Sequence, residues 1–453
     1  MPDGPTTNAR PASPDDPLAS YESRPLWQAQ MPELPDHRGR ELPDSVDVVV
    51  VGGGYTGVSA ARRLAQAGAS VTLLEAGRLG SGASTRNGGI VHPGYHWGPA
   101  ELEHRYGAEL GRQLFAETLE GYRVLRDLIA EEGIDAELVE RGHLELAYAP
   151  SHLDGLRAAQ RGLAAAGVDC SIVPRERLAE EIGSTAYFGA LAVEGSGALH
   201  PGRLFAGLAE SAARAGADLH EGVRATGVQT QADGRVVVET DRGAIIAGEV
   251  IVGTNGYTDG FVPALRRRII PIGSYIIATE PLSEELAAEL SPRGRAFFDT
   301  KNFLYYWRLT KDRRMVFGGR ASFIPTSVER IARILHAGLI EVHPQLAATR
   351  IDYAWGGNVG FTFDRMPHVG RLGGVTYAMG YCGTGVVMAT YLGSRVADWI
   401  GGSPAPALAL ASLSFPLVPV PYEGRPWFLP FAGEWFRLRD RLAGRDRGRA
   451  GGA

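Results

Sequence analysis

Three glycines at a characteristic spacing mark the part of the sequence with the clearest chemistry. Gly52, Gly54 and Gly57 form a G-x-G-x-x-G pattern directly after the apolar run 48–51. In such a pattern the first glycine makes a tight turn, the second lets a pyrophosphate approach the backbone, and the third allows a helix to pack closely on a strand. The segment 58–68 is amphipathic and ends at a glycine. It predicts a helix whose N-terminus attracts an anion.

A carboxylate about twenty residues beyond the turn adds to this prediction. The run 70–74 predicts a second strand, and Glu75 follows it where an acid can accept both hydroxyls of an adenosine ribose. A purely structural glycine turn is the simpler interpretation of the spacing alone. Because strand, turn, helix, second strand and acid fall in register, dinucleotide binding is favoured. Glu75 indicates an unphosphorylated ribose, as in FAD or NAD rather than NADP.

A second glycine-rich loop, residues 80–89, follows Glu75. Loops of small residues within a globular core usually let another group come close to the backbone. We expect this loop to wrap the same cofactor, with Arg86 and Asn87 reaching its pyrophosphate or its ring. A flexible connection is the alternative.

Two further segments repeat the pattern of a strand followed by a glycine turn. The strand predicted at 249–252 leads into the turn 253–257, and residues 377–385 lead into a helix predicted from 386 to 400. The dinucleotide-binding unit is therefore expected to be interrupted and resumed along the chain. The N-terminus of the last helix can stabilise the negative charge of a reduced flavin.

Aromatic side chains beside a cation mark a candidate substrate site. The strand-like run 303–309 contains Tyr305, Tyr306, Trp307 and Arg308. Aromatic faces can hold an amine, and Arg308 can pair with a carboxylate, which would make this run the wall of a substrate pocket. A half-buried strand with a surface arginine is an equally weighted alternative.

Length and composition limit the classes of protein. A chain of 453 residues with 44% hydrophobic and 21% charged residues is typical of a soluble protein with two or more domains. The net charge of −5 provides no attraction to nucleic acid or anionic lipid. Two cysteines, Cys170 and Cys382, exclude a disulfide framework and favour the cytoplasm. No apolar run is long enough for a membrane span, and the oligomeric state stays open.

No metal site is expected. His92 and His96 have i,i+4 spacing, but Pro93 and Gly94 between them prevent a regular helix. The many prolines of residues 1–44 predict an extended N-terminal arm.

Taken together, these segments resemble the D-amino-acid oxidase/glycine oxidase/sarcosine oxidase superfamily of FAD flavoenzymes, and most of all its gamma-glutamylputrescine oxidase branch. The matching segments span roughly residues 45 to 402 and are 48–57, 80–89, 254–257, 364–367 and 380–385.

The resemblance implies an α/β fold, mixed with α+β, in which a glutathione-reductase-type Rossmann domain that binds FAD is interleaved with an antiparallel-sheet substrate domain. The expected division is an N-terminal arm (1–44), a discontinuous FAD-binding domain (45–136, 196–267 and 359–402), a substrate domain (137–195 and 268–358) and a C-terminal extension (403–453).

Residues and resemblance together predict one set of cofactor-binding residues. They are Gly52, Gly54, Tyr55, Thr56, Gly57, Glu75, Ala76, Ser84, Arg86, Asn87, Gly88, Gly89, Ala225, Thr254, Asn255, Gly256, Gly380, Cys382, Gly383, Thr384 and Gly385.

The resemblance also implies an activity: oxidation of the C–N bond of a small amine or amino acid to an imine, with oxygen as the acceptor and hydrogen peroxide as a product. Two alternatives stay open. One is a dehydrogenase that passes electrons to a quinone or a protein, and the other is a non-catalytic FAD-binding subunit. Aromatic hydroxylases share the FAD domain but consume reduced nicotinamide.

The sequence departs from sarcosine oxidases at three positions. The cysteine that tethers FAD in those enzymes aligns near Gly357, so FAD is expected to be non-covalent. The lysine that holds the substrate carboxylate is replaced by Val387, and the lysine that activates oxygen is replaced by Val316. Three cations are candidates for the oxygen-activating role: Arg320, Arg86 and Lys301.

Overall fold

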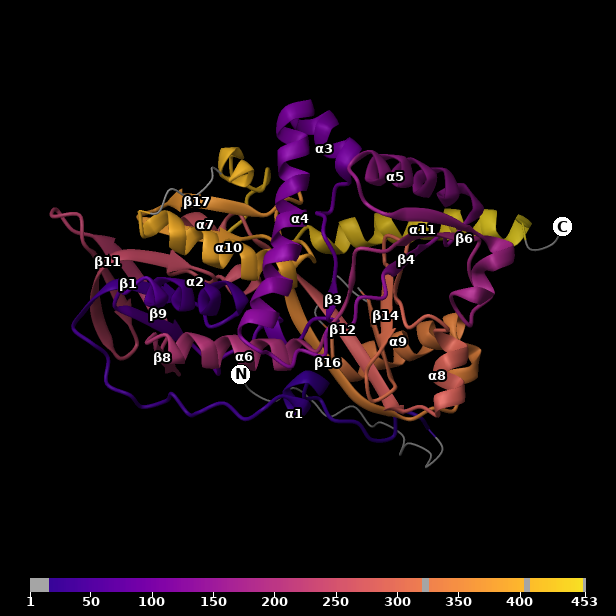
Figure 1. Cartoon of the computed structure of the whole chain (residues 1–453), viewed down its shortest axis with the longest axis horizontal. Coiled ribbons are helices and arrows are strands. Elements are labelled where there is room, and N and C mark those ends of the chain that lie inside the picture. Colours follow the sequence, from indigo (N-terminus) through magenta and orange to yellow (C-terminus); the bar gives the residue numbers. More distant parts are fainter. Residues whose placement is uncertain (1–15, 320–325, 403–407, 451–453) are drawn as a thin grey trace.

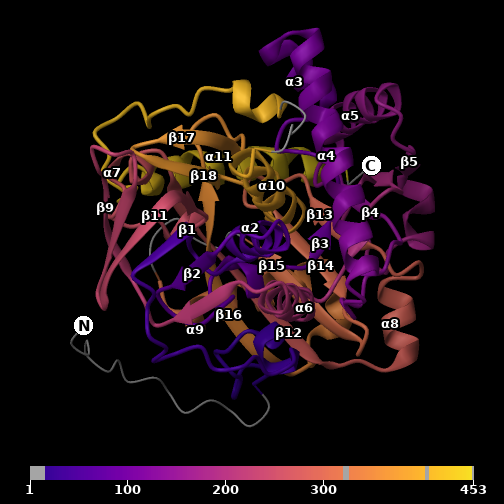
Figure 2. The same cartoon turned by 60° about the vertical axis from the view of Figure 1, so that its left-hand side comes forward.

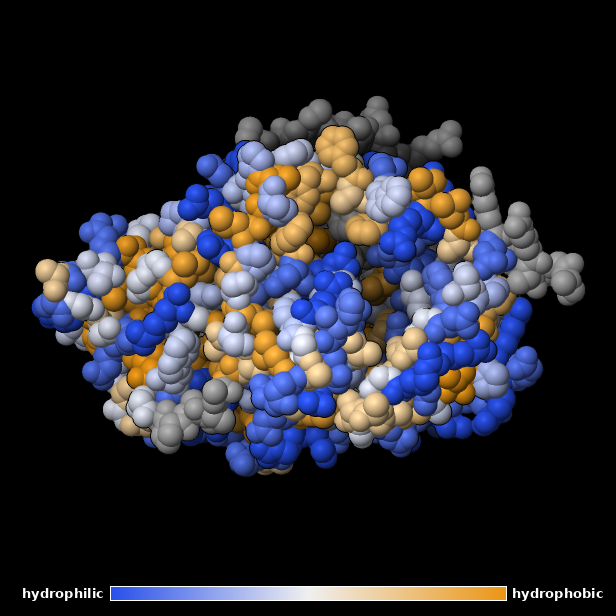
Figure 3. All heavy atoms as spheres, turned by 90° about the horizontal axis from the view of Figure 1, so that it is seen from above, coloured by the Kyte–Doolittle hydropathy of each residue, from blue (hydrophilic) through white to orange (hydrophobic). Residues whose placement is uncertain are grey.

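Two β-sheets lie side by side, with the long helix α4 (Ala108–Glu131) between them in the view of Figure 1. The structure is a computed structural model that describes residues 16–319, 326–402 and 408–450. Seen from above, the surface is hollowed near the middle of the molecule (Figure 3). No helix of the described residues is long and apolar enough to cross a membrane.

The first sheet is largely parallel and has the order β17-β18-β11-β1-β2-β8. Strand β1 lies between β11 and β2 and is parallel to both. Its residues Val48–Val51 are buried, as expected for a central parallel strand that is covered on both faces. The strands are β1 (Ser45–Val51), β2 (Val71–Glu75), β8 (Asp218–Glu221), β9 (Ala225–Thr230), β10 (Val236–Thr240), β11 (Gly243–Val252), β17 (His368–Leu372) and β18 (Val375–Met379).

The two faces of this sheet belong to different cores. Val48 and Val50 pack with the helices α2 (Tyr55–Gln66), α6 (Pro201–Arg214) and α10 (Gly385–Ile400). Val49 and Val51 pack against the β9–β10 hairpin and the short helix α7 (Pro263–Arg266). Figure 2, in which the left-hand side of Figure 1 comes forward, shows α2 and α6 in front of this sheet.

The second sheet has the order β16-β12-β15-β14-β13-β4-β6-β5. All its neighbours are antiparallel except β13 and β4. Its strands are β4 (His143–Leu146), β5 (Cys170–Pro174), β6 (Gly189–Val193), β12 (Ile270–Pro281), β13 (Ala296–Asp299), β14 (Tyr305–Leu309), β15 (Arg314–Gly319) and β16 (Ile351–Phe361). The two sheets confirm the predicted mixed α/β fold class.

The antiparallel sheet is also covered on both faces. One face packs on α8 (Glu284–Leu290) and α9 (Val328–Val342). The other face contributes Leu191 and Val193 to the core around α4. The remaining described α-helices and strands are α1 (Leu26–Gln30), β3 (Ile90–Val91), α3 (Pro99–Tyr106), α5 (Leu153–Ala165), β7 (Gly197–Ala198) and α11 (Leu429–Ala450).

The described part of the N-terminal arm is mainly extended but docks through the short helix α1. Trp27 is fully buried, and its indole Nε1 donates a hydrogen bond of 2.7 Å to the carbonyl of Asn87. Gln28 donates to Thr85 Oγ1 at 2.7 Å, and Gln30 donates to Asp312 at 2.9 Å. The arm therefore connects the second glycine-rich loop with the antiparallel sheet.

We expect Trp27→Ala to destabilise the protein by about 3 to 5 kcal/mol, because it empties a buried site and removes a hydrogen bond to the loop. Trp435→Ala is the matched control, since Trp435 on α11 is 60% exposed. Urea unfolding of both variants measures the difference. Equal stability of the two variants would contradict the docking of the arm.

Candidate functional site

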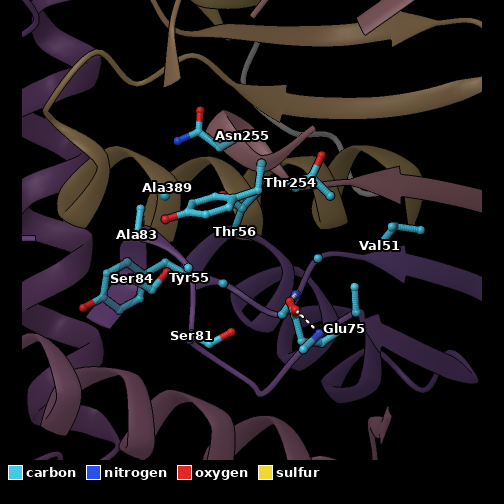
Figure 4. A pocket seen from close by; sticks show the side chains of 18 of the residues that line it. Val51, Tyr55, Thr56, Glu75, Ser81, Ala83, Ser84, Thr254, Asn255 and Ala389 are labelled. Atoms are coloured by element: carbon cyan, nitrogen blue, oxygen red, sulfur yellow. Dashed lines mark hydrogen bonds between the residues drawn. The ribbon is translucent and has the colours of Figure 1, made fainter. Parts of the chain in front are cut away.

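A cavity of about 420 Å³ lies over the ends of the first strands of the parallel sheet (Figure 4). Four separate parts of the chain meet around it: the turn after β1, the loop after β2, the turn after β11 and the turn before α10. Its lining residues are Val51, Gly52, Gly53, Gly54, Tyr55, Thr56, Leu74, Glu75, Ala76, Gly77, Ser81, Gly82, Ala83, Ser84, Asn87, Val223, Arg224, Ala225, Gly253, Thr254, Asn255, Tyr257, Asp259, Phe261, Val359, Tyr381, Gly383, Gly385, Val386 and Ala389.

The turn after β1 has the geometry that its glycines predict. Gly52 has φ +108°, a backbone conformation that other residues rarely adopt. A Cβ on Gly57 would lie 1.9 Å from the Gly52 carbonyl oxygen, so only glycine fits there. Gly54 is the N-cap of α2 and offers no side-chain acceptor, while Ser84 Oγ accepts from Tyr55 N at 2.9 Å. The positive end of α2 therefore faces the cavity without a cap from its own N-cap residue, and Ser84 accepts from its first N–H group, that of Tyr55.

Glu75 ends β2 and is held in a fixed orientation at the cavity wall. Its Oε2 accepts from Gly53 N at 2.8 Å, and its Oε1 accepts from Gly77 N at 2.7 Å (Figure 4). Because each carboxylate oxygen has two lone pairs, both oxygens can still accept a hydroxyl. The backbone of the first turn thus orients the predicted ribose acid.

The second glycine-rich loop divides between the cavity and the antiparallel sheet. Ser84 and Asn87 line the cavity, and Asn87 Oδ1 accepts from Gly89 N at 2.8 Å. Arg86 turns away: its Nε donates to Ser81 O at 2.7 Å and its Nη1 donates to Gly356 O at 2.8 Å. The loop therefore joins the cavity to strand β16.

The other two turns are tied to each other. Asn255 Oδ1 accepts from Gly380 N at 2.9 Å, which holds the turn after β11 beside the turn before α10. Cys382 is buried and its thiol donates to Gly380 O at 3.1 Å. Thr384 is the N-cap of α10, and Gly383 has open space at the position of a Cβ. A second helix N-terminus therefore faces the cavity.

The structure brings thirteen of the predicted cofactor-binding residues to the cavity: Gly52, Gly54, Tyr55, Thr56, Glu75, Ala76, Ser84, Asn87, Ala225, Thr254, Asn255, Gly383 and Gly385. The others lie beside or behind these residues and do not line it: Gly57, Arg86, Gly88, Gly89, Gly256, Gly380, Cys382 and Thr384.

Several lining residues were not predicted from the sequence. Tyr381 is inside a predicted motif, and its hydroxyl lies 2.7 Å from Thr56 Oγ1. Asp259, Phe261 and Val359 belong to no motif, because they reach the cavity only through tertiary packing. Val386 and Ala389 lie in the first turns of the helix predicted from 386 to 400. The apolar and small residues there were the only signal in the sequence that they could line the cavity.

Strand β14 places its predicted site residues on two different faces, because alternate residues of a strand point in opposite directions. Trp307 is 1% exposed and packs on Tyr187, Phe297 and Phe317, away from the cavity. Tyr305 lies on the same face, over α9.

Arg308 lies on the opposite face of β14, where its guanidinium donates hydrogen bonds to backbone carbonyls. Its Nε donates to Gly88 O at 2.8 Å and its Nη2 donates to Leu199 O at 2.6 Å. Burial lowers its pKa to about 10, so the side chain stays charged at neutral pH. Arg308 therefore holds the backbone of the second glycine-rich loop against β14. The remaining predicted residue, Arg320, lies outside the described residues.

His92 and His96 do not form a metal pair. The ring of His92 contacts His143 and Phe298, whereas His96 Nε2 lies 2.9 Å from Arg365 Nη1. Among residues 16–319, 326–402 and 408–450 no group of three or more metal-ligating side chains is present.

Residues 47–399 match the protein family described as FAD dependent oxidoreductase. The chain belongs to this family. It is 35% identical over 402 residues to the gamma-glutamylputrescine oxidoreductase of Escherichia coli (strain K12), which covers 87% of this chain and 93% of that protein. It is 34% identical over 424 residues to the probable oxidoreductase OrdL of Rhizobium meliloti (strain 1021), which covers 92% of this chain and 97% of that protein.

A solved structure shows the same fold. Glycine oxidase from Geobacillus kaustophilus superposes with a TM-score of 0.71 at 22% identity, over 83% of this chain and 99% of that chain. The matches confirm the predicted family resemblance, FAD as the cofactor and the assignment as an oxidoreductase. The donor set of the cavity also fits FAD, since two helix N-termini suit anionic groups and Glu75 suits a ribose.

Glu75→Ala should weaken FAD retention roughly 10- to 100-fold, because a charged hydrogen-bond acceptor is lost and Gly53 and Gly77 lose their partner. The ratio of flavin to protein absorbance after gel filtration measures retention. Glu109→Ala, at an exposed site on α4, is the control. Unchanged flavin content in Glu75→Ala would remove the assignment of Glu75.

Proposed function

We propose that this FAD-dependent oxidoreductase oxidises the C–N bond of an amine or amino acid to an imine. The course of the cavity carries the proposal. It runs from Glu75 at the end of β2 to Val359 on β16, so a cofactor extended along it would end at the antiparallel sheet. Relatives named for gamma-glutamylputrescine and for glycine, both of which contain an amine, support a nitrogen-bearing substrate.

In this proposal each end of the cavity has a separate task. Glu75 accepts hydrogen bonds from the ribose hydroxyls, and the N-terminus of α2 binds the pyrophosphate. The turn at Gly383 and the N-terminus of α10 face the ring end of the cofactor, where they stabilise negative charge. Asn87 and Asn255 fix the turns that surround the ring. The predicted cofactor-binding residues that do not line the cavity determine the backbone conformation of these turns.

FAD, when bound, would accept the hydride that leaves the carbon next to the substrate nitrogen. The task of the chain is to bind the amine, to orient it and to keep it unprotonated. An apolar, aromatic surface does this by disfavouring the charged ammonium form. Tyr306 is placed for that role: its ring lies against Gly88, and its hydroxyl is 3.0 Å from Ser274 Oγ.

The residues predicted on β14 take different roles in this proposal. Arg308 positions the Gly88–Gly89 backbone, and Tyr305 and Trp307 support the sheet from its α9 face. Tyr306, between them, faces the substrate. Arg320 stays a candidate from the sequence alone.

Oxygen is the proposed electron acceptor. Arg86, whose guanidinium is held behind the cavity wall by the carbonyls of Ser81 and Gly356, is the cation proposed to act on it from there. Arg86 belongs to a loop that lines the cavity, whereas Lys301 pairs with Asp299 at 3.2 Å and lies over Tyr305 on the α9 face. A cation near the site of electron transfer stabilises the charge that develops on oxygen. The second candidate function is a dehydrogenase with a quinone or protein acceptor, favoured by the replacement of the expected lysine with buried Val316.

Two further features of the proposal concern the cysteines. The position where sarcosine oxidases tether FAD aligns near Gly357, which offers no thiol, so the cofactor is proposed to be non-covalent. Cys170 and Cys382 form no disulfide, which supports a reducing compartment such as the cytoplasm.

Acid precipitation should release the yellow cofactor into the supernatant, because no bond holds it to the chain. Absorbance spectra of supernatant and pellet measure the distribution. Colour that stays with the pellet would contradict non-covalent binding and would direct attention to Cys382.

Anaerobic mixing with the correct amine should bleach the flavin absorbance, because electrons leave the C–N bond and have no other acceptor. The screen comprises N-methyl amino acids, D-amino acids, glycine, polyamines and glutamyl polyamines. Admission of air should restore the colour and produce hydrogen peroxide if oxygen is the acceptor. Slow recovery in air with fast dye reduction would favour the dehydrogenase, and no bleaching by any amine would reject both.

A further inference from the structure

Three side chains form a straight row across the antiparallel sheet. Tyr306 on β14 pairs with Phe298 on β13, and Phe298 pairs with Glu145 on β4. Paired residues on neighbouring strands point to the same face, and neighbouring strands lie about 4.8 Å apart. Glu145 is therefore displaced from Tyr306 by about 10 Å along the sheet.

The row lies on the face of the sheet that looks toward the cofactor loop. The Tyr306 ring lies so close to Gly88 that a Cβ there would be 2.8 Å from it. The alternate residues Leu144 and Phe297 point to the opposite face, into the core with α9. Glu145 consequently shares its face with the proposed site of amine oxidation.

Glu145 is an unusual residue for this position. Within the described ranges 16–319, 326–402 and 408–450 its side-chain carboxylate forms no hydrogen bond and no ion pair, and burial raises its pKa to about 7. Its side chain is surrounded by protein and still retains accessible surface, as do Phe298 and Tyr306. A desolvated carboxylate without a partner is costly unless a ligand provides one.

The surroundings of Glu145 suit a cation. The Phe298 ring stacks on His143 at a centroid distance of 4.9 Å, and His92 lies 5.4 Å from His143. Aromatic faces attract cations, and a carboxylate beside them adds a charged acceptor. Burial holds the pKa values of both His92 and His143 below their usual range, so neither imidazole repels a cation at neutral pH.

We propose that Glu145 binds a second, positively charged nitrogen of the substrate, remote from the C–N bond that is oxidised beside Tyr306. The enzyme then selects amines that carry a cationic group about 10 Å from the reacting nitrogen. This inference rests on the proposed amine oxidation for the position of the reacting end. Phe298 lies between the two ends and contacts the chain that links them.

The test compares diamines with monoamines of equal length. The diamines are putrescine, cadaverine and hexamethylenediamine, and the monoamines are n-butylamine, n-pentylamine and n-hexylamine. Calorimetry with the FAD-loaded enzyme under anaerobic conditions measures binding, and loss of flavin absorbance measures reaction. For each chain length, the ratio of the affinity for the diamine to the affinity for the monoamine is compared. This ratio should increase from putrescine to hexamethylenediamine.

Glu145→Gln should lower the affinity for hexamethylenediamine roughly 10- to 100-fold and leave that for n-hexylamine unchanged, since only the charged hydrogen bond is lost. Glu145→Asp should retain part of the preference. Glu176→Gln, at an exposed site after β5, is the control. Equal losses for both amines in Glu145→Gln, or no preference in the unmodified enzyme, would overturn the proposal.

The pH dependence gives a second readout that a purely structural role would not change. Only the carboxylate form binds a cation strongly, so the affinity for the diamine should fall as the pH is lowered through about 7. Glu145→Gln should abolish that dependence. Diamine binding that needs Glu145 but causes no flavin bleaching would keep the cation site and reject the proposed oxidation.

Discussion

The close contact between Gly57 and the carbonyl of Gly52 is the constraint on which the cofactor half depends. A Cβ at Gly57 would lie 1.9 Å from that oxygen, so α2 can begin directly over β1 only because the side chain is absent. Two other glycines nearby allow similarly close backbone contacts. A Cβ on Gly393 of α10 would lie 2.3 Å from the carbonyl of Thr56, and one on Gly253 would lie 3.1 Å from the Thr56 side chain. Two helix N-termini and one strand end therefore converge on one small volume.

The sequence predicted the elements of this half well because each signal is local. The apolar run before Gly52, the amphipathic helix after Gly57 and the acid at Glu75 are adjacent in the chain, and backbone geometry alone relates them. Asp259, Phe261 and Val359 also line the cavity, but they come from segments without a motif. Only the packed structure brings them there, so no pattern in the sequence could select them.

The substrate half shows where sequence reasoning fails in physical terms. A strand covered on both faces is apolar or aromatic throughout, and a cluster such as Tyr305, Tyr306 and Trp307 does not reveal which face is which. The structure resolves this: Trp307 belongs to the core with α9, and Tyr306 faces the cofactor loop. Glu145 carried no signal at all in the sequence, because a single acid in an alternating strand is normally a solvated one. Only the register between β4, β13 and β14 shows that Glu145 lies on the same face of the sheet as Tyr306.

The docking of the N-terminal arm has a consequence for how the chain is made. Glu22 pairs with Tyr353, and Gln30 donates to Asp312, so the first described segment finds these partners 282 or more residues later in the chain. At about 5 to 20 residues per second, the ribosome needs roughly twenty to seventy seconds to reach residue 353. Until then Leu26 and Trp27 lack the residues of the antiparallel sheet against which they pack, among them Val316 and Trp355. The nascent chain must keep this apolar pair from premature association until the antiparallel sheet has emerged.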